Sequence, residues 1–266
     1  MLSYLTDIVV DVQERLQAAE RIFLFLDFDG TLAPIEADFA VPKLDPGSRE
    51  TLALLASQPA VVTTIISGRA AEDLFSRIRL KGLIYAGNHG LEIFGRSLRF
   101  VEPLAARRQA RLEDLSNDVS VRLRPIAGAI VEFKGLTASV HYRQAAEPDH
   151  AEIHAAVRMA AGAEAGLFRL IHGHKVIEIL PCTNWHKGAA AAWIIHRLGG
   201  DNALTIYLGD DAGDEKAFQV LTDAVTIKVG AQPSCAEYRL PHPAAVHEFL
   251  RWLATRSAQP AEGLKP

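Results

Sequence analysis

The chain is poor in the residue types that mark several protein classes. Its 266 residues include only two cysteines, Cys182 and Cys235, which offer neither a disulfide framework nor a paired-cysteine zinc pattern. No apolar run approaches the ~20 residues needed to cross a bilayer. Lysine and arginine are slightly outnumbered by aspartate and glutamate, and the net charge of −4 gives no electrostatic reason to expect a nucleic-acid partner. We therefore expect neither a membrane nor a nucleic acid among the partners.

Signals for export and for several enzyme classes are also missing. The N-terminal stretch MLSYLTDIVVDVQERLQ has no basic lead-in and no small-residue cleavage site, and its acidic residues suit an amphipathic helix, so we expect a cytoplasmic protein. The sequence contains no GxGxxG, P-loop, GxSxG or HExxH motif. Cofactor redox, nucleotide-loop, serine-hydrolase and zinc-protease functions therefore have little support.

What the sequence does contain is a composition typical of a soluble globular protein, with 49% hydrophobic and 23% charged residues. Near both ends of the chain, short apolar runs alternate with helical patterns, which predicts a parallel sheet covered on both faces. The predicted strands are residues 23–26, 61–66, 83–86, 203–208 and 224–229. The predicted helices are residues 48–57, 69–78, 187–198, 214–221 and 244–254.

The middle of the chain follows a different pattern. Two helical stretches, 104–121 and 148–161, are each followed by two alternating segments that are joined near a glycine, which predicts an antiparallel sheet with helices on one face. The predicted fold class is therefore α/β. We expect a Rossmann-like parallel-sheet core formed by residues 1–103 and 183–266, with an inserted α+β cap domain of the αββαββ type at residues 104–182.

Polar clusters follow four of the predicted core strands. They are Asp27-Phe28-Asp29-Gly30-Thr31, Ser67-Gly68-Arg69, Gly87-Asn88-His89-Gly90 and Gly209-Asp210-Asp211. In open α/β sheets, ligands bind beyond the carboxyl ends of the strands. If the strands are parallel, these clusters converge on one edge of the sheet.

The acidic residues in these clusters predict a metal site. Asp27 and Asp29 end an apolar strand, where unpaired carboxylates are costly to bury. Asp210, Asp211 and Asp214 add to the repulsion, since two charges ~4 Å apart repel by ~4 kcal/mol at an effective dielectric constant of about 20. A hard divalent cation relieves this repulsion, and Mg²⁺ suits carboxylates combined with water and a phosphate. A single aspartate at a strand end is ordinarily a helix N-cap, so the argument depends on the whole set.

The same clusters suit phosphoryl transfer. Two carboxylates two residues apart can divide the work, one attacking phosphorus and the other handling the proton of the leaving oxygen. The phosphoryl oxygens need hydrogen-bond donors and positive charge, which Ser67 with the following Gly68 and Lys187 can supply. Alone, Ser67 would suit a helix cap and Lys187 a solvated helix surface.

Four segments occur in the order of known motifs. DFDGT at 27–31, SGR at 67–69, HKG at 186–188 and GDD at 209–211 resemble the four motifs of haloacid-dehalogenase-type phosphatases, and the resemblance extends over nearly the whole chain. It implies that Asp27 is the nucleophile and Asp29 the general acid/base. It further implies that Ser67, Gly68 and Lys187 bind the phosphate.

The resemblance also implies a Mg²⁺ cofactor. The implied ligands are Asp27, the main-chain carbonyl of Asp29, and Asp210. Asp211 and Asp214 are implied to support this site or to bind the metal through water. The chain departs from the usual GDDxTDE pattern, because Gly213 stands at the threonine position of GDDAGDE. Since the acidic positions are kept, we expect metal binding to be retained.

A narrower resemblance lies outside these motifs. GNHG at 87–90, VEFKG at 131–135, SVHYR at 139–143 and VIEILP at 176–181 are similar to segments of trehalose-6-phosphate phosphatases. The similarity implies hydrolysis of trehalose 6-phosphate to trehalose and phosphate through an aspartyl phosphate, the final step of trehalose biosynthesis. It also implies a cap that closes over the core. The implied substrate-binding residues are Asn88 and His89 of the core and Glu132, Lys134, His141, Arg143 and Glu178 of the cap.

Strand geometry fits this assignment without deciding it. Side chains alternate along a strand, so Glu132 shares a face with Lys134, and His141 shares one with Arg143. A polyol needs such paired donors and acceptors. The alternative is a solvated sheet face with cross-strand ion pairs.

Other functions stay open at this point. The chain could hydrolyse another sugar phosphate, such as sucrose phosphate or mannosyl-3-phosphoglycerate, or act as a phosphomutase. It could also be an inactive, sugar-phosphate-binding regulatory subunit. The expected partner is a small sugar phosphate, with the protein as a monomer in functional pairing with trehalose-6-phosphate synthase.

Overall fold

The computed structural model describes residues 3–36, 44–164, 166–173, 175–200 and 202–257. The chain divides into two compact units. We call residues 1–99 and 186–266 the larger unit, and residues 100–185 the smaller unit. From the sequence, the two boundaries between the units were predicted at 103/104 and 182/183.

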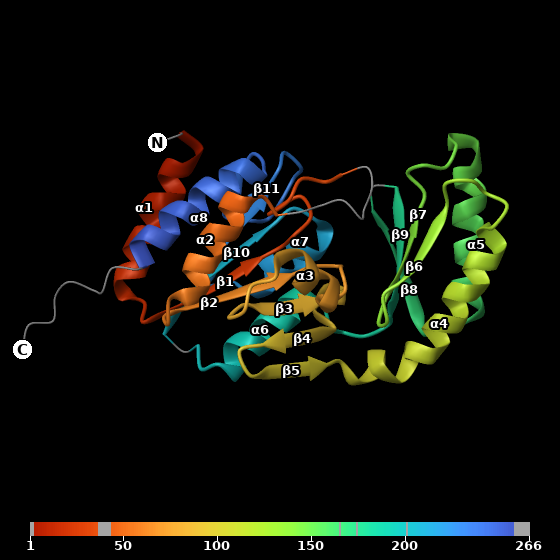
Figure 1. Cartoon of the computed structure of the whole chain (residues 1–266), viewed down its shortest axis with the longest axis horizontal. Helices are drawn as coiled ribbons and strands as arrows, with labels where there is room; N and C mark the ends of the chain where they lie inside the picture. Colours follow the sequence, from red (N-terminus) through yellow and green to blue (C-terminus); the bar gives the residue numbers. More distant parts are fainter. Residues whose placement is uncertain (1–2, 37–43, 165, 174, 201, 258–266) are drawn as a thin grey trace, which may run out of the picture. The chain divides into compact units, whose positions relative to one another are not determined.

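The larger unit is built on one eight-stranded sheet with the order β12-β11-β10-β1-β2-β3-β4-β5, in which the last two residues of β5, Phe100 and Val101, already count with the smaller unit (Figure 1). Neighbouring strands from β12 to β3 run parallel, whereas β4 pairs antiparallel with β3. The strands in chain order are β1 (Arg21–Leu26), β2 (Val61–Ile66), β3 (Ile84–Gly87), β4 (Glu92–Gly95), β5 (Leu98–Val101), β10 (Ala203–Gly209), β11 (Val225–Val229) and β12 (Tyr238–Leu240). The predicted α/β class and its parallel sheet are confirmed.

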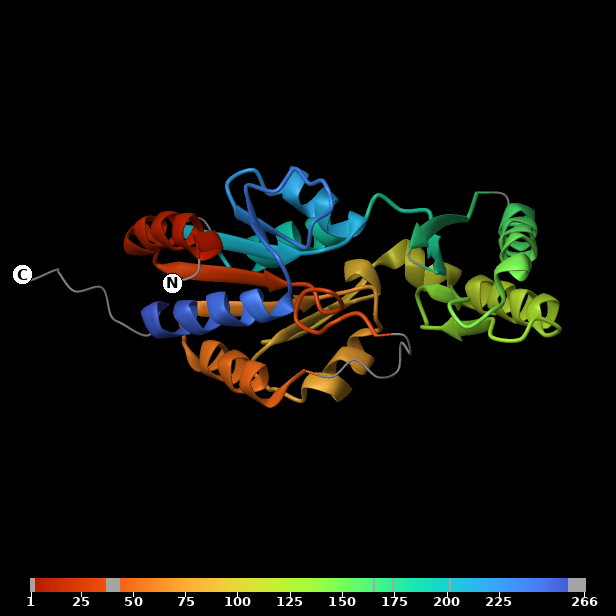
Figure 2. The same ribbon diagram turned by 90° about the horizontal axis from the view of Figure 1, so that it is seen from above.

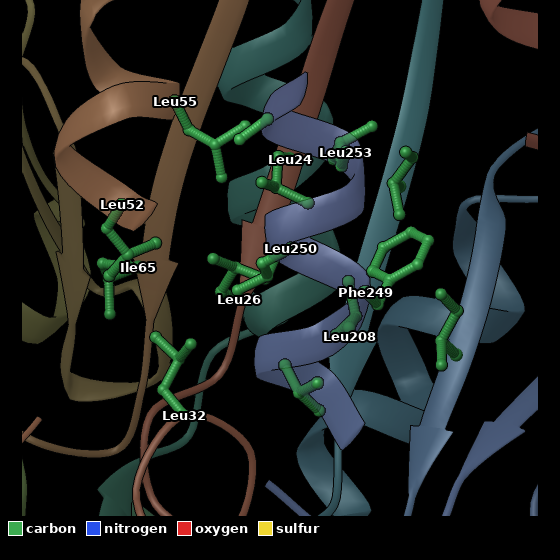
Figure 3. Packing of buried hydrophobic residues seen from close by; sticks show 14 of the residues in the cluster. Leu24, Leu26, Leu32, Leu52, Leu55, Ile65, Leu208, Phe249, Leu250 and Leu253 are labelled. Atoms are coloured by element: carbon green, nitrogen blue, oxygen red, sulfur yellow. The ribbon is translucent and has the colours of Figure 1, made fainter. Parts of the chain in front are cut away.

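Helices cover both faces of this sheet, as the alternation of side chains along its strands requires. The even-numbered residues of β1 pack into one core with α1 (Ser3–Ala18), α2 (Pro46–Ser57), α3 (Ala71–Ile78) and α8 (Pro243–Ser257). Figure 3 shows Leu24 and Leu26 of this core beside Leu250 and Leu253. On the other face, Phe25 stacks on Tyr207, whose ring meets Phe218 of α7. In Figure 2 the sheet lies between α8 on one side and α7 on the other.

Among its described residues, the larger unit contains two further helices and one 3-10 turn. They are α6 (Lys187–Arg197), α7 (Ala212–Val220) and the 3-10 turn η1 (Asn88–Gly90). No helix in the described part of the chain is both long and apolar enough to span a membrane.

The sequence analysis missed the antiparallel edge formed by β4 and β5. Only Arg96 and Ser97 join these strands, and both have positive φ, at 45° and 65°. Two consecutive residues with positive φ form the tight turn that suits a hairpin, which asparagine and glycine usually supply. Because Arg-Ser is not a typical turn pair, the sequence carried no signal for this hairpin.

The smaller unit has an antiparallel sheet with the order β6-β7-β9-β8. Its strands are β6 (Ile130–Phe133), β7 (Ala138–His141), β8 (Phe168–Gly173) and β9 (Val176–Pro181). Its helices are α4 (Pro103–Leu123) and α5 (His150–Ala163), with the 3-10 turn η2 (Glu147–Asp149). Both helices pack against side chains of alternate strand positions, such as Val140 and Ile177, so the predicted αββαββ order is confirmed.

The two ends of the smaller unit lie together. The rings of Phe100 and Trp185, its first and last residues, stack with centroids 4.7 Å apart and an interplanar angle of 26°. The chain therefore enters and leaves this unit at one place.

Candidate active site

The strand order of the larger unit brings the predicted polar clusters to one edge. β10, β1, β2 and β3 are consecutive, parallel neighbours. Leu26 is in register with Leu208, and the amide of Asp27 donates to the carbonyl of Leu208 over 3.0 Å. The segments that begin at Asp27 and Gly209 therefore leave the sheet side by side.

A buried lysine lies at the centre of this edge. The side chain of Lys187, at the first position of α6, has no solvent exposure. Its Nζ lies 2.8 Å from Oδ1 of Asp27, 2.8 Å from Oδ1 of Asp214 and 3.1 Å from Oδ2 of Asp211. Burying a lysine is very costly unless carboxylates and hydrogen bonds compensate its charge, and here three carboxylates do so.

Asp211 and Asp214 also form the start of α7. Asp211 caps the helix, with Oδ1 accepting from the amide of Asp214 over 2.9 Å. Oδ2 of Asp214 accepts from the amides of Asp210 and Asp211, both over 3.0 Å. Oδ1 of Asp214 also accepts from the hydroxyl of Tyr207 over 2.9 Å. The four protein donors around Asp214 hold the 209–214 loop in one shape.

The acidic groups at this edge perturb one another. Burial raises the pKa of Asp27 well above its usual value, opposed by Lys187 and reinforced by Asp210. Burial and then the charges of Asp211 and Asp214 raise the pKa of Asp210 to about 7. Burial and then Asp211 also raise the pKa of Asp214 well above its usual value. The positive charge of Lys187 therefore does not fully offset the burial and mutual repulsion that raise the pKa values of these carboxyls.

The pKa values of Lys187 and Asp211 shift in the direction opposite to the one that burial alone would cause. Burial acts to lower the pKa of Lys187, but Asp211, Asp214 and Asp27 outweigh it and raise that pKa well above its usual value. Burial likewise disfavours the charged form of Asp211, but Lys187 and the hydrogen bonds with Asp214 lower its pKa below the usual range. Lys187 and Asp211 therefore form a charged pair at this edge.

The donor set at this edge fits a hard divalent cation. Carboxylate oxygens of Asp27, Asp210 and Asp214 all lie within 4.8 Å of one another. Mg²⁺ takes oxygen ligands and is usually bound by one or two carboxylates with waters and phosphate oxygens. Added positive charge here would relieve the repulsion that raises the pKa of Asp210. The residues present therefore fit the implied cofactor.

Two glycines make room for these carboxylates. Gly30 has a φ of +82°, and a Cβ on it would lie 2.2 Å from Oδ2 of Asp210. A Cβ on Gly209 would lie 2.2 Å from Cγ of Asp214. Any side chain at Gly30 or Gly209 would displace one of the clustered acids, which explains the glycine in each motif.

Asp29 has a separate partner. Nε of Arg69 lies 2.6 Å from Oδ2 of Asp29, and Nη2 of Arg69 lies 2.7 Å from Oδ1. Nη1 of Arg69 reaches Asp73 of α3 over 3.2 Å, and its guanidinium lies over the ring of Phe28. This two-pronged pair is the strong, oriented kind of ion pair. It fixes the direction of the Asp29 carboxylate.

Ser67 and its neighbours form the next part of the edge. Ser67 is buried, and its carbonyl accepts from the amide of His89 over 2.8 Å, so the segments after β2 and β3 are tied together. Gly68 follows Ser67 in this segment. Asn88 is fully buried, and its Nδ2 donates to Glu92 over 2.7 Å. In this structure the Asn88 side chain therefore holds its own loop in place.

The predicted residues of the smaller unit gather on the sheet face opposite its helices. Glu132, Ser139 and Glu178 are in register across β6, β7 and β9. Nζ of Lys134 lies 3.2 Å from Oε1 of Glu178, and Nε2 of His141 lies 2.9 Å from Oε2 of Glu132. The result is a row of paired donors and acceptors on one sheet face.

Arg143 lies two residues beyond the end of β7 and is half-buried. The structure thus brings four of the five predicted residues of this unit into two pairs, and places Arg143 beyond the strand that carries His141.

Sequence analysis gave no role to several residues that support this edge. Arg69 was part of the quoted SGR motif, but nothing in the sequence pairs it with Asp29, forty positions away. Tyr207 was an apolar strand residue in the prediction, yet its hydroxyl contacts Asp214. Lys228 was included in a predicted strand, where a single charge among apolar residues was a usable signal.

Comparison with known proteins places the chain. The family model described as trehalose-phosphatase matches residues 25–245. An uncharacterized glycosyl hydrolase of Mycobacterium tuberculosis is 39% identical over 253 residues, which are 91% of this chain but 19% of that protein. The chain thus spans about one fifth of that relative's length. Trehalose 6-phosphate phosphatase RA3 of Zea mays is 34% identical over 258 residues, which cover 89% of this chain and 71% of that protein.

A solved structure shows the same fold. The C-terminal domain of Candida albicans trehalose-6-phosphate phosphatase superposes with a TM-score of 0.78 at 22% identity, covering 92% of this chain and 96% of that one. At this identity the superposition establishes the fold alone. The sequence match over residues 25–245 goes further, and by it the chain belongs to the trehalose-phosphatase family.

Proposed function

We propose that the protein is a Mg²⁺-dependent phosphatase that converts trehalose 6-phosphate and water to trehalose and phosphate, the last step of trehalose synthesis. The observation that carries the proposal is the buried contact of 2.8 Å between Lys187 and Asp27, beside the acidic cluster, in a chain of this family. A buried carboxylate next to a cation at the edge of a parallel sheet is suited to attack a phosphoryl group whose charge that cation balances.

In the first step, a carboxylate oxygen of Asp27 attacks phosphorus and the bond from phosphorus to the sugar oxygen breaks. Asp29 gives its proton to that oxygen, which leaves as a sugar hydroxyl, and Asp27 carries the phosphoryl group. Lys187 and Ser67 bind the phosphoryl oxygens, and the backbone at Gly68 contributes N–H donors. In the structure, Arg69 contacts both carboxylate oxygens of Asp29 and sets the direction of this side chain.

In the second step, Asp29 takes a proton from a water molecule, whose oxygen attacks the phosphorus on Asp27. The bond between phosphorus and the Asp27 oxygen breaks, which releases phosphate and regenerates both carboxyl groups. Exclusion of bulk water during the first step favours transfer to Asp27 over direct hydrolysis.

The residues that would hold Mg²⁺ are Asp27, Asp210 and the main-chain carbonyl of Asp29, with Asp211 and Asp214 supporting the loop. When bound, the ion supplies positive charge that neutralises the carboxylates and the transferring phosphoryl oxygens. Asp214 suits the supporting role because four protein donors already occupy its oxygens.

The sheet face of the smaller unit supplies the groups that bind the sugar. Glu132, Lys134, His141 and Glu178 present polar donors and acceptors there. Arg143 of the same unit and His89 of the larger unit are proposed as further donors. Because charged groups hydrogen-bond hydroxyls strongly, such a face distinguishes a glucose-containing ligand from a bare phosphoester. We include in the proposal a monomer that acts in the cytoplasm in functional pairing with trehalose-6-phosphate synthase.

A substrate panel tests the proposal directly. Phosphate release is measured for trehalose 6-phosphate, sucrose 6-phosphate, mannosyl-3-phosphoglycerate and glucose 6-phosphate, with Mg²⁺ and with a chelator. We expect kcat/KM for trehalose 6-phosphate to exceed the others by at least about tenfold, as for a site built to hydrogen-bond its substrate. The chelator should abolish release. Equal rates across the panel would contradict the substrate, and binding without phosphate release would indicate a regulatory subunit.

A further inference from the structure

A second buried lysine lies near the acidic cluster and has no role in the steps above. Lys228 is the only charged residue of β11, a strand in which every residue is buried. Its side chain is 4% exposed. A buried ammonium costs several kcal/mol unless it is compensated, so its partners identify what it does.

Lys228 reaches the loop that carries the acids. It is in register with Gly209 on the neighbouring strand β10. Its Nζ donates to the main-chain oxygen of Asp210 over 2.7 Å and lies 3.2 Å from Oε1 of Glu215. Glu215 in turn accepts from the amide of Cys235 over 3.0 Å. Lys228 therefore joins the loop at residue 210 to the first turn of α7.

These contacts fix Asp210 from both sides. Its amide donates to Asp214 over 3.0 Å, and its carbonyl accepts from Lys228. With both of its polar backbone groups held, the direction of the Cα–Cβ bond of Asp210 is set, and with it the approach of its carboxylate to Asp27. Lys187, by contrast, contacts the carboxylates of Asp27, Asp211 and Asp214 themselves.

We propose that Lys228 and Glu215 form a positioning pair that orients Asp210 for the divalent cation, an inference that rests on the proposed function. Groups that hold metal ligands in place contribute to metal affinity without touching the ion, and their loss typically costs about 10- to 100-fold. The pair carries no net charge, so it acts through geometry and adds little to the field at the metal.

The decisive variant is Lys228→Met combined with Glu215→Gln. Together these changes remove both charges and leave the net charge unaltered. Glutamine keeps the length of Glu215, and methionine is unbranched and only one atom shorter than Lys228. Mg²⁺ alone is titrated into the metal-free protein by calorimetry, with cooperative thermal unfolding as the test of folding. We expect the dissociation constant for Mg²⁺ to rise about 10- to 100-fold. A constant within twofold of the parent protein would overturn the proposal.

Thr226→Val is the matched control. Thr226 is buried on the same face of β11, two residues from Lys228, and its hydroxyl accepts from the amide of Glu237. This variant removes a buried hydrogen bond at a distance from the loop, so it should lower the melting temperature and keep Mg²⁺ affinity. A matching loss of affinity in Thr226→Val would show a general effect of destabilisation and would overturn the proposal.

If the double variant does not unfold cooperatively, Glu215→Ala replaces it. Glu215 lies on a partly exposed helix turn, and its removal leaves Lys228 with the carbonyl of Asp210 but without a counter-charge. A rise of at least about fivefold in the dissociation constant supports the pair, and an unchanged constant overturns it. These readouts need no substrate, so a failure to hydrolyse trehalose 6-phosphate would refute the proposed function separately.

Discussion

The guanidinium of Arg69 donates to both carboxylate oxygens of Asp29, from Nε over 2.6 Å and from Nη2 over 2.7 Å. The two side chains come from segments that follow adjacent strands, β1 and β2. Asp73 of α3 holds the third nitrogen of the same guanidinium over 3.2 Å. The carboxylate that we propose as the general acid and base is thus oriented by an arginine that is itself held by Asp73.

Replacing Arg69 by lysine should slow reactions that need a proton at the leaving group. Lysine keeps the charge but loses the planar fork, so Asp29 would be poorly aimed. The loss of kcat/KM should be at least about tenfold larger for trehalose 6-phosphate than for p-nitrophenyl phosphate, because nitrophenolate leaves without a proton. Steady-state kinetics with both substrates measures the ratio.

Arg77→Lys is the control for this variant. Arg77 lies on the same helix, α3, and also contacts Asp73, over 2.7 Å. Any loss of kcat/KM in the Arg77→Lys variant should be the same for trehalose 6-phosphate and p-nitrophenyl phosphate. Equal losses for the two substrates in Arg69→Lys would mean that Arg69 only stabilises the fold.

Asp27→Asn should abolish turnover while the protein stays folded. The amide cannot form the proposed aspartyl phosphate, yet Lys187 keeps Asp211 and Asp214 as partners. We expect phosphate release to fall at least ~1,000-fold, as for loss of an essential nucleophile. Asp118→Asn, an exposed aspartate of α4 that pairs with Arg122, should keep full activity. Appreciable phosphate release by Asp27→Asn would refute its assignment as nucleophile.

Glu178→Ala should weaken binding of the sugar and spare the chemistry. Lys134 and Glu178 contact each other on the sheet face of the smaller unit. Loss of a hydrogen bond to a charged group, at ~1.5–3 kcal/mol, predicts a KM for trehalose 6-phosphate about 10- to 100-fold higher. Kinetics with p-nitrophenyl phosphate, which has no sugar, should change little.

Arg111→Ala tests whether any broken ion pair in that unit has the same effect. Arg111 pairs with Glu164 between helix α4 and the end of α5, and its loss should leave KM unchanged. If Glu178→Ala slows p-nitrophenyl phosphate as much as trehalose 6-phosphate, its role is structural.

Asp45→Ala should destabilise the larger unit by about 1 kcal/mol, the usual cost of losing a helix cap. Asp45 accepts from the amides of Gly47 and Ser48 and from the Ser48 hydroxyl at the start of α2. These hydrogen bonds and nearby His247 outweigh the opposing effect of burial and lower the pKa of Asp45. Urea unfolding at several pH values measures the difference.

The sign of the pH dependence follows from that shift. A lowered pKa in the folded state stabilises the protein above the unfolded pKa of about 4, and this is lost as pH falls through the folded value. The difference between Asp45→Ala and the parent should therefore shrink below about pH 4. Asp45→Asn keeps the capping oxygen and should cost less. A difference that stays constant down to pH 2 would contradict this assignment.

Much of the fold could be predicted from local patterns. Short runs of apolar and β-branched residues, such as Val61–Ile66, predicted the parallel strands, because both faces of that sheet are covered. The hairpin at Arg96 and Ser97 could not be predicted, since an unusual residue pair adopts the left-handed conformation there. The strand Tyr238–Leu240 is too short to leave a pattern.

The candidate site could also be predicted only in part. The sequence predicted carboxylates at strand ends, namely Asp27, Asp29 and Asp210, and the order of the strands brings them to one edge. The residues that hold these carboxylates in place could not be predicted from the sequence. The pairing of Arg69 with Asp29 depends on side-chain directions across two loops, which no periodicity records. Asn88 differs from these residues, because the sequence predicted that it binds substrate. In the structure its side-chain amide donates to Glu92, four residues further on.

The stacked rings of Phe100 and Trp185 make the smaller unit modular. A segment whose ends are pinned together interrupts its host as a short loop would, so its 86 residues add little closure entropy to the folding of the larger sheet. Chain insertions of this geometry are well tolerated. Such a segment can be exchanged for another of the same end-to-end spacing while the host sheet is kept, so the two units can change independently in evolution.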